Sequence, residues 1–106
     1  MRQLHEMQLR GDPIYLVDVR QPWEHELVSL PNMGAGEVLV PLDQLAERHD
    51  EIAPPADALV VTYCHHGVRS INAAVMLERI GHARVASLHG GIDAWSQLID
   101  PSLPRY

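Results

Sequence analysis

The residue in this sequence that is best suited to chemistry is its only cysteine, Cys64. It follows the apolar run Leu59–Val61, which is typical of a strand covered on both faces, and it precedes a helical pattern that begins near Arg69. Backbone N–H groups in such a loop and the positive end of the helix dipole both favour a thiolate over a thiol. We therefore expect Cys64 to be ionised near neutral pH and to act as a nucleophile.

The residues after the cysteine suggest how the loop supports this chemistry. Gly67 allows positive φ or a close approach of the backbone to the sulfur, Arg69 can add a fixed positive charge, and Ser70 can donate from its hydroxyl or cap the helix. His65 and His66 can line the pocket entrance, where protonation would favour anionic donors; the alternative is that they are solvated loop residues. Zinc binding is disfavoured because a structural site needs a set of ligands at recognisable spacings and there is no second cysteine.

A charged pair, Asp18 and Arg20, lies at the end of an earlier strand pattern. We expect the two side chains to pair and to hold neighbouring loops, which makes them supporting residues rather than catalytic ones. Trp23 and Trp95 are expected to pack in the core or at its edge, and Gly90–Gly91 to form a turn close to the cysteine loop.

Strand patterns alternate with helix patterns along the chain. The strands are expected at Ile14–Val19, Glu37–Val40, Ala58–Tyr63 and Arg84–Leu88. The helices are expected at Arg2–Arg10, Pro22–Leu27, Pro41–Ile52, Arg69–Ile80 and Gly91–Leu98. This alternation predicts an α/β fold with an open parallel sheet of four to five strands and helices on both faces. In such folds the ligand binds beyond the carboxyl ends of the strands, which is where Cys64 falls.

Length and composition narrow the function classes. The 106 residues predict one domain over 1–106 with one core. A net charge of −6 without any lysine gives no basic surface for nucleic acid. No apolar run approaches the roughly 18 residues of a spanning helix, so no membrane role is expected. The N-terminus lacks the apolar core of a signal peptide and a lone cysteine cannot form an internal disulfide, which together predict a cytoplasmic protein.

Three motifs in chain order resemble those of rhodanese-like domains. They are Leu16–Arg20 followed by Pro22 and Glu24, the loop Cys64–Ser70, which resembles the family's Cys-x-x-Gly-x-Arg-Ser, and Gly90–Trp95, which resembles Gly-Gly-x-x-Ala-Trp. The resemblance runs from about Ile14 to Trp95.

The sequence departs from the family in two places. Leu27–Gly36 replaces a compact Gly-His-Ile-Pro-Gly-Ala-like passage, so acceptor choice is expected to be affected. The family's usual first strand is missing before Arg2–Arg10, which favours a piece of a longer protein, and Ile99–Tyr106 resembles the tail of rhodanese domains attached to adenylyltransferases of the molybdopterin and thiamine pathways.

The resemblance implies sulfur transfer without a cofactor or metal. Cys64 would take sulfane sulfur from a donor, either thiosulfate or a protein persulfide, and pass it to an acceptor, which would be a thiol, cyanide or a small sulfur-carrier protein. The implied catalytic residues are Cys64 and Arg69, and the implied substrate-binding residues are His65, His66, Gly67, Val68 and Ser70.

Two alternatives stay open. Fold-related phosphatases and arsenate reductases use the same cysteine, but their loop between Cys and Arg is longer than the four residues that separate Cys64 from Arg69 here. A smaller loop favours one sulfur atom over a tetrahedral oxyanion. The other alternative is a non-catalytic interaction module, because a fold does not fix a function.

Overall fold

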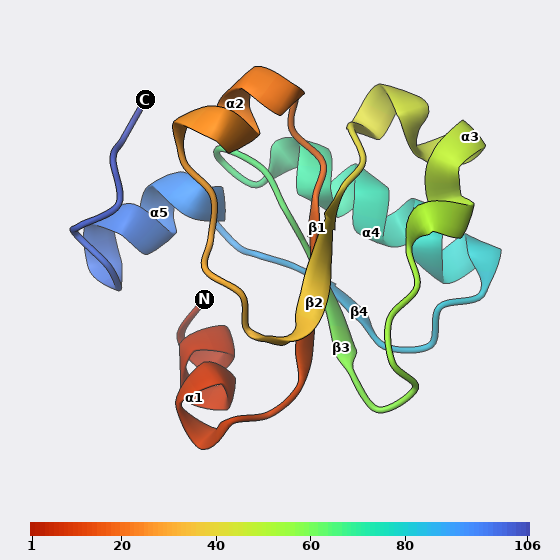
Figure 1. Cartoon of the computed structure of the whole chain (residues 1–106), viewed down its shortest axis with the longest axis horizontal. Helices are drawn as coiled ribbons and strands as arrows, with labels where there is room; N and C mark the ends of the chain where they lie inside the picture. Colours follow the sequence, from red (N-terminus) through yellow and green to blue (C-terminus); the bar gives the residue numbers. More distant parts are fainter.

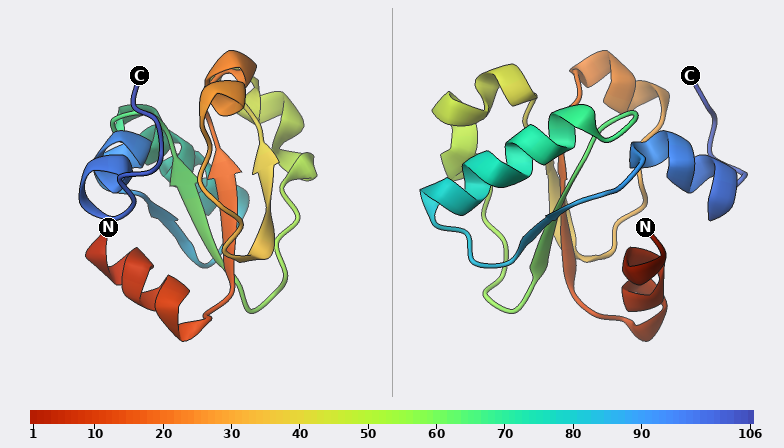
Figure 2. Two further views of the ribbon diagram at one scale, coloured as in Figure 1. Left: turned by 60° about the vertical axis from the view of Figure 1, so that its left-hand side comes forward. Right: turned by 180° about the vertical axis from the view of Figure 1, so that it is seen from behind.

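The computed structural model describes residues 1–106 and contains one four-stranded sheet in the order β2-β1-β3-β4 (Figure 1). The strands are β1 (Ile14–Asp18), β2 (Gly34–Leu39), β3 (Leu59–Tyr63) and β4 (Val85–Ser87). All three pairings are parallel, so every strand ends at the same edge of the sheet (Figure 2). The expected open parallel sheet is confirmed, with the smaller of the two strand numbers.

Helices cover both faces of this sheet, as expected. In chain order they are α1 (Arg2–Arg10), α2 (Pro22–Leu27), α3 (Leu45–Arg48), α4 (Val68–Ile80) and α5 (Gly91–Leu98). Figure 1 shows α1 and α5 on one side of the sheet and α3 and α4 on the other. The longest helix, α4, has 13 residues, and no helix combines the length and apolarity needed to cross a membrane.

Alternation along β1 explains the two layers. Successive side chains of a strand point to opposite faces, and all five residues of β1 are buried. Ile14 and Leu16 pack in the core below α1 and α5, whereas Tyr15 and Val17 pack in the core below α3 and α4. Trp95 is buried in the first of these cores, which confirms the packing role predicted for it.

The segment Pro41–Ile52 differs from the single helix that its apolar spacing predicts. It consists of a 3₁₀ turn, the four residues of α3 and a second 3₁₀ turn, with non-helical ψ angles at Gln44 and Arg48. Leu45 and Ile52 are nevertheless buried. The apolar spacing therefore reflects burial of these side chains and not one continuous helix, and a helix as short as α3 has little stability without that packing.

The second strand also differs from its prediction, since β2 begins at Gly34 rather than Glu37. Gly34 pairs with Ile14, and the register shifts before Leu16 pairs with Glu37. Gly34 and Gly36 have φ of 105° and 104°. Glycines adopt this conformation readily, but they lack the β-branched side chains by which a strand is recognised in a sequence, so the sequence does not predict the start of β2. The remaining bounds differ from prediction by at most one residue, and the whole of the predicted order of elements is present.

A buried ion pair stands at the carboxyl end of β1. The Arg20 guanidinium donates to both Asp18 carboxylate oxygens, with N–O distances of 2.8 and 2.7 Å, and to the carbonyl oxygen of Val28 at 2.7 Å. Its remaining nitrogen donates to the Tyr106 hydroxyl at 2.9 Å. A charge pair can be held inside a fold only when its polar atoms are satisfied in this way.

Glu24 of α2 continues this network to α4 and to the C-terminal segment. Its carboxylate accepts two hydrogen bonds from the Arg69 guanidinium, at 2.7 and 2.9 Å, and one from the Tyr106 hydroxyl at 2.7 Å. The backbone N–H of Gln21 donates to it at 3.1 Å. Chiefly because of the Arg69 hydrogen bonds, and against the effect of burial, the pKa of Glu24 is lowered to about 2.

Glu24 should therefore make the stability of the fold depend on pH. A carboxyl group whose folded-state pKa is depressed stabilises the fold fully above its unfolded pKa, and this contribution is lost as the pH falls through the folded pKa. We expect the free energy of unfolding, measured in urea, to fall as the pH goes from about 5 to about 2. Glu24→Gln should lower it by about 2–3 kcal/mol at pH 7 and flatten that slope.

The matched control is Glu78→Gln, which removes an exposed carboxylate from α4 and should change neither quantity. Equal slopes for Glu24→Gln and the wild type would contradict the assigned role of the carboxylate.

Candidate functional site

Cys64 lies at the sheet edge where the strands end, between β3 and α4. Its Sγ accepts a hydrogen bond from the backbone N–H of Gly67 at 3.1 Å and lies 3.6 Å from the Ser70 hydroxyl oxygen. Gly67 precedes the first residue of α4, so the sulfur sits at the N-terminal end of a 13-residue helix. The Gly67 N–H group and the N-terminal end of the helix both favour negative charge on sulfur.

Two glycines allow this loop to close tightly. Gly67 has a φ of 103°, in the left-handed region that other residues rarely adopt. Gly91 has a φ of 65°, and a Cβ added to it would stand 2.4 Å from the carbonyl oxygen of His65 and 2.5 Å from that of Cys64. The turn predicted at Gly90–Gly91 is thus confirmed to lie against the cysteine loop.

The first backbone N–H groups of α5 fix the loop. Ile92 donates to the carbonyl oxygen of Cys64 at 2.9 Å, and Asp93 donates to that of His65 at 3.0 Å. No peptide bond is cis, so the N–H group of each of these two peptide units points away from α5. The carbonyl groups of Cys64 and His65 therefore face α5, and the N–H groups of the same peptide units face the opposite side of the loop.

The thiol is covered rather than open to a pocket. Cys64 is 1% exposed and packs in the core below α3 and α4. Below it, the Ser70 hydroxyl donates to the carbonyl oxygen of Gly67 at 3.2 Å and pairs with the Ser87 hydroxyl at 2.7 Å. A hollow of about 320 Å³ adjoins the loop, and its walls include His66, Gly67 and Val68 but not Cys64.

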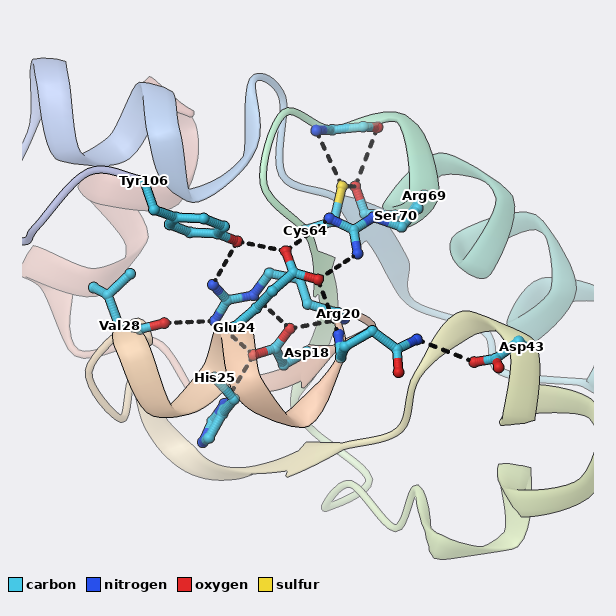
Figure 3. Close-up of polar contacts among 12 residues, drawn as sticks. Asp18, Arg20, Glu24, His25, Val28, Asp43, Cys64, Arg69, Ser70 and Tyr106 are labelled. Atoms are coloured by element: carbon cyan, nitrogen blue, oxygen red, sulfur yellow. Dashed lines mark hydrogen bonds and ion pairs between the residues drawn. The ribbon is translucent and has the colours of Figure 1, made fainter.

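Arg69 points to Glu24 rather than standing free beside the sulfur (Figure 3). Its pKa is raised, first by the Glu24 hydrogen bonds. The carboxylate is the strongest acceptor within reach of the guanidinium, and the two form a bidentate pair. The expected positive charge of Arg69 is present, but the Glu24 carboxylate neutralises it.

The two histidines differ in environment. The His65 ring stacks on Tyr106 with a centroid distance of 3.9 Å and an angle of 9°, and its buried Nε2 has no hydrogen-bond partner. Burial, helped by the neighbouring His66, lowers the pKa of His65. His66 is exposed, with Nδ1 3.7 Å from the Asp93 carboxylate. The substrate-binding role of His65 and His66 stays a prediction, while the lowered pKa disfavours the protonated form of His65 that the expected positive potential requires.

Other predicted residues do not hydrogen-bond to the sulfur. Asp18 and Arg20 pair behind the loop, and Val68 faces solvent. Tyr106 and Ser87 were not foreseen as part of the site, because neither belongs to a local motif. Only the return of the C-terminal segment and the parallel pairing of β3 with β4 bring them to the loop.

Comparison with known proteins agrees with this geometry. A family model described as a rhodanese-like domain matches residues 1–98. A sulfurtransferase of Allochromatium vinosum is 36% identical over 86 residues, which is 81% of this chain and 75% of that protein. A rhodanese-like domain protein from Staphylococcus aureus superposes with a TM-score of 0.75 at 26% identity, covering 99% of this chain and 93% of the other.

A longer relative is the adenylyltransferase and sulfurtransferase uba4 of Ogataea parapolymorpha, which is 34% identical over 92 residues. The match covers 87% of this chain but only 22% of that protein. The extent of the family match, the cysteine loop at the sheet edge and the parallel sheet together show that this chain belongs to the rhodanese-like domain family.

Proposed function

We propose that this chain is a sulfurtransferase that carries sulfane sulfur as a persulfide on Cys64. The observation that carries the proposal is the placement of Sγ 3.1 Å from the Gly67 N–H, at the start of α4 and inside a loop fixed by α5. A thiolate stabilised by backbone dipoles is a competent nucleophile at neutral pH.

The reaction would consist of two displacements. In the first, the Cys64 thiolate attacks the sulfane sulfur of the donor, an S–S bond forms, and the donor's own S–S bond breaks with its electron pair leaving on the departing group. With thiosulfate that group is sulfite. In the second, an acceptor thiolate or cyanide attacks the outer sulfur and releases the Cys64 thiolate, so no net oxidant or cofactor is required.

Loop amides would hold the outer sulfur of the persulfide. The N–H groups of His65 and His66 point away from α5, and that of Gly67 already binds Sγ. An added anionic sulfur inside the loop would be stabilised by these fixed donors as an oxyanion is stabilised in acyl transfer. The role of Arg69 in this scheme is to keep the start of α4 in place through its pair with Glu24.

The physiological acceptor is proposed to be a thiol or a small sulfur-carrier protein. The longer relative is named as both an adenylyltransferase and a sulfurtransferase. This pair of activities supports a carrier protein that is activated by adenylylation as the sulfur acceptor. His66 and Val68 are exposed beside the loop, where an acceptor protein could contact them.

The first test is the mass of the protein after incubation with a sulfane-sulfur donor such as thiosulfate. We expect the wild type to gain one sulfur atom and to lose it to cyanide with the formation of thiocyanate. Cys64→Ser should do neither, because it removes the nucleophile. Hydrolysis of an aryl phosphate by the wild type, without any gain of sulfur, would instead favour the phosphatase alternative, and absence of both activities would favour an interaction module.

The second test separates loop closure from general stability. Gly91→Ala and Gly11→Ala both place a side chain at positive φ, 65° and 79°, but only the added Cβ of the first collides with the cysteine loop. Each should cost about 1 kcal/mol of stability from backbone strain, and the collision should make Gly91→Ala the less stable of the two. Gly91→Ala should also lower persulfide formation by at least about tenfold, because the α5 hydrogen bonds to the loop are broken. Equal rates of persulfide formation in the two variants would show that the close approach is dispensable.

A further inference from the structure

Every arginine around the cysteine loop is already paired with an acid. Arg69 binds Glu24 at 2.7 Å, Arg20 binds Asp18 at 2.7 Å, and Arg105 binds Asp93 at 3.0 Å. The chain contains no lysine and carries a net charge of −6. An approaching donor therefore meets no unpaired cationic side chain of arginine or lysine at this loop.

Of the two loop histidines, the one stacked on Tyr106 does not supply the missing charge. The pKa of His65 is lowered first by burial, and the exposed His66 lies 3.7 Å from the Asp93 carboxylate, which also binds Arg105. The loop stabilises negative charge on its own sulfur through backbone dipoles, whose field falls off faster with distance than that of a net charge. Such a loop can activate a thiolate without attracting a dianion from solution.

Glu24 keeps Arg69 from serving as an anion receptor. The Glu24 side chain is 5% exposed, and both of its oxygens are occupied by Arg69 together with Tyr106 and Gln21. A donor that captured Arg69 would leave a buried carboxylate without its cation, and this is strongly unfavourable. The pair thus behaves as a fixed unit with no net charge.

The exposed surface beside the loop carries apolar side chains next to His66 and His89. Val68 and Ile71 on α4 are 72% and 57% exposed, and Trp23, which contacts Tyr106 edge-on at 6.1 Å, is 59% exposed. These side chains suit a donor with an organic body better than a small, strongly hydrated dianion.

We propose that Glu24 determines donor specificity: by neutralising Arg69 it selects organic persulfides over small dianionic donors such as thiosulfate. This inference rests on the proposed sulfur transfer. In the selected reaction the Cys64 thiolate attacks the outer sulfur of a persulfide R–S–SH, forming the Cys64 persulfide, and the R–S thiolate leaves with the electron pair and takes up the proton.

The test compares two donors under single-turnover conditions, with sulfur loading on Cys64 followed by intact mass. Thiosulfate is the dianion, and cysteamine persulfide is the organic donor, because its ammonium group leaves it without net negative charge whether its persulfide is protonated or ionised. The quantity compared is the ratio of the two loading rates, thiosulfate over persulfide. Any change in the reactivity of Cys64 itself affects both rates and cancels in this ratio.

Glu24→Gln should raise this ratio by about tenfold, because it removes one negative charge close to the path of a dianion. The matched control Glu78→Gln removes the same charge from the exposed side of α4 and should leave the ratio unchanged. A ratio in Glu24→Gln equal to that of the wild type would overturn the proposal.

A second measurement needs no variant. In the wild type, thiosulfate loading should stay level or become faster as salt is raised to roughly 0.3 M, because no net attraction is screened. A rate that falls with salt would mean that a cation recruits the dianion, and this contradicts the proposal.

The two proposals fail in different ways. If both donors load the wild type and the ratio does not respond to Glu24→Gln, donor selection is wrong while sulfur transfer stands. If neither donor adds sulfur to the wild type, sulfur transfer is wrong and the specificity proposal falls with it.

Discussion

The whole site depends on two backbone hydrogen bonds from the start of α5 to the cysteine loop, from Ile92 to the Cys64 carbonyl and from Asp93 to the His65 carbonyl. They satisfy N–H groups that a helix start leaves without partners, and they orient the peptide units of the loop. The contact is possible only because Gly91 has no side chain. A motif near the end of the chain is therefore a structural part of the loop that carries the thiol.

A second constraint is the polar network that runs from β1 to α4. Asp18 binds Arg20, Arg20 binds the Tyr106 hydroxyl, and that hydroxyl donates to Glu24, which holds Arg69. Each charge has a partner, so the network can be buried at the open edge of the sheet. It joins α2, α4 and the C-terminal segment where the cysteine loop needs a rigid frame.

Much of this could be predicted from the sequence because it is local. The strand before Cys64, the helix after it and the glycines of the loop are each encoded within a few residues, and their order implies the parallel sheet. The pairing of Arg69 with Glu24 and the stacking of Tyr106 on His65 could not be predicted, since they join residues far apart in sequence. The first residues of β2 could not be predicted either, because glycines have low strand propensity and this part of the strand forms through its pairing with β1.

The unforeseen contacts change the electrostatics more than the fold. From the loop sequence alone, Arg69 and two histidines suggest a cationic entrance. In the folded chain Arg69 is neutralised by Glu24, and the His65 ring, stacked on Tyr106, has a lowered pKa. What remains to stabilise a sulfur anion is the set of backbone dipoles at the start of α4, which act strongly only at short range. In the proposed reaction, activation of the thiolate and attraction of the donor are thus separate properties: the first is built into the backbone, and the second is left to the side chains around the loop.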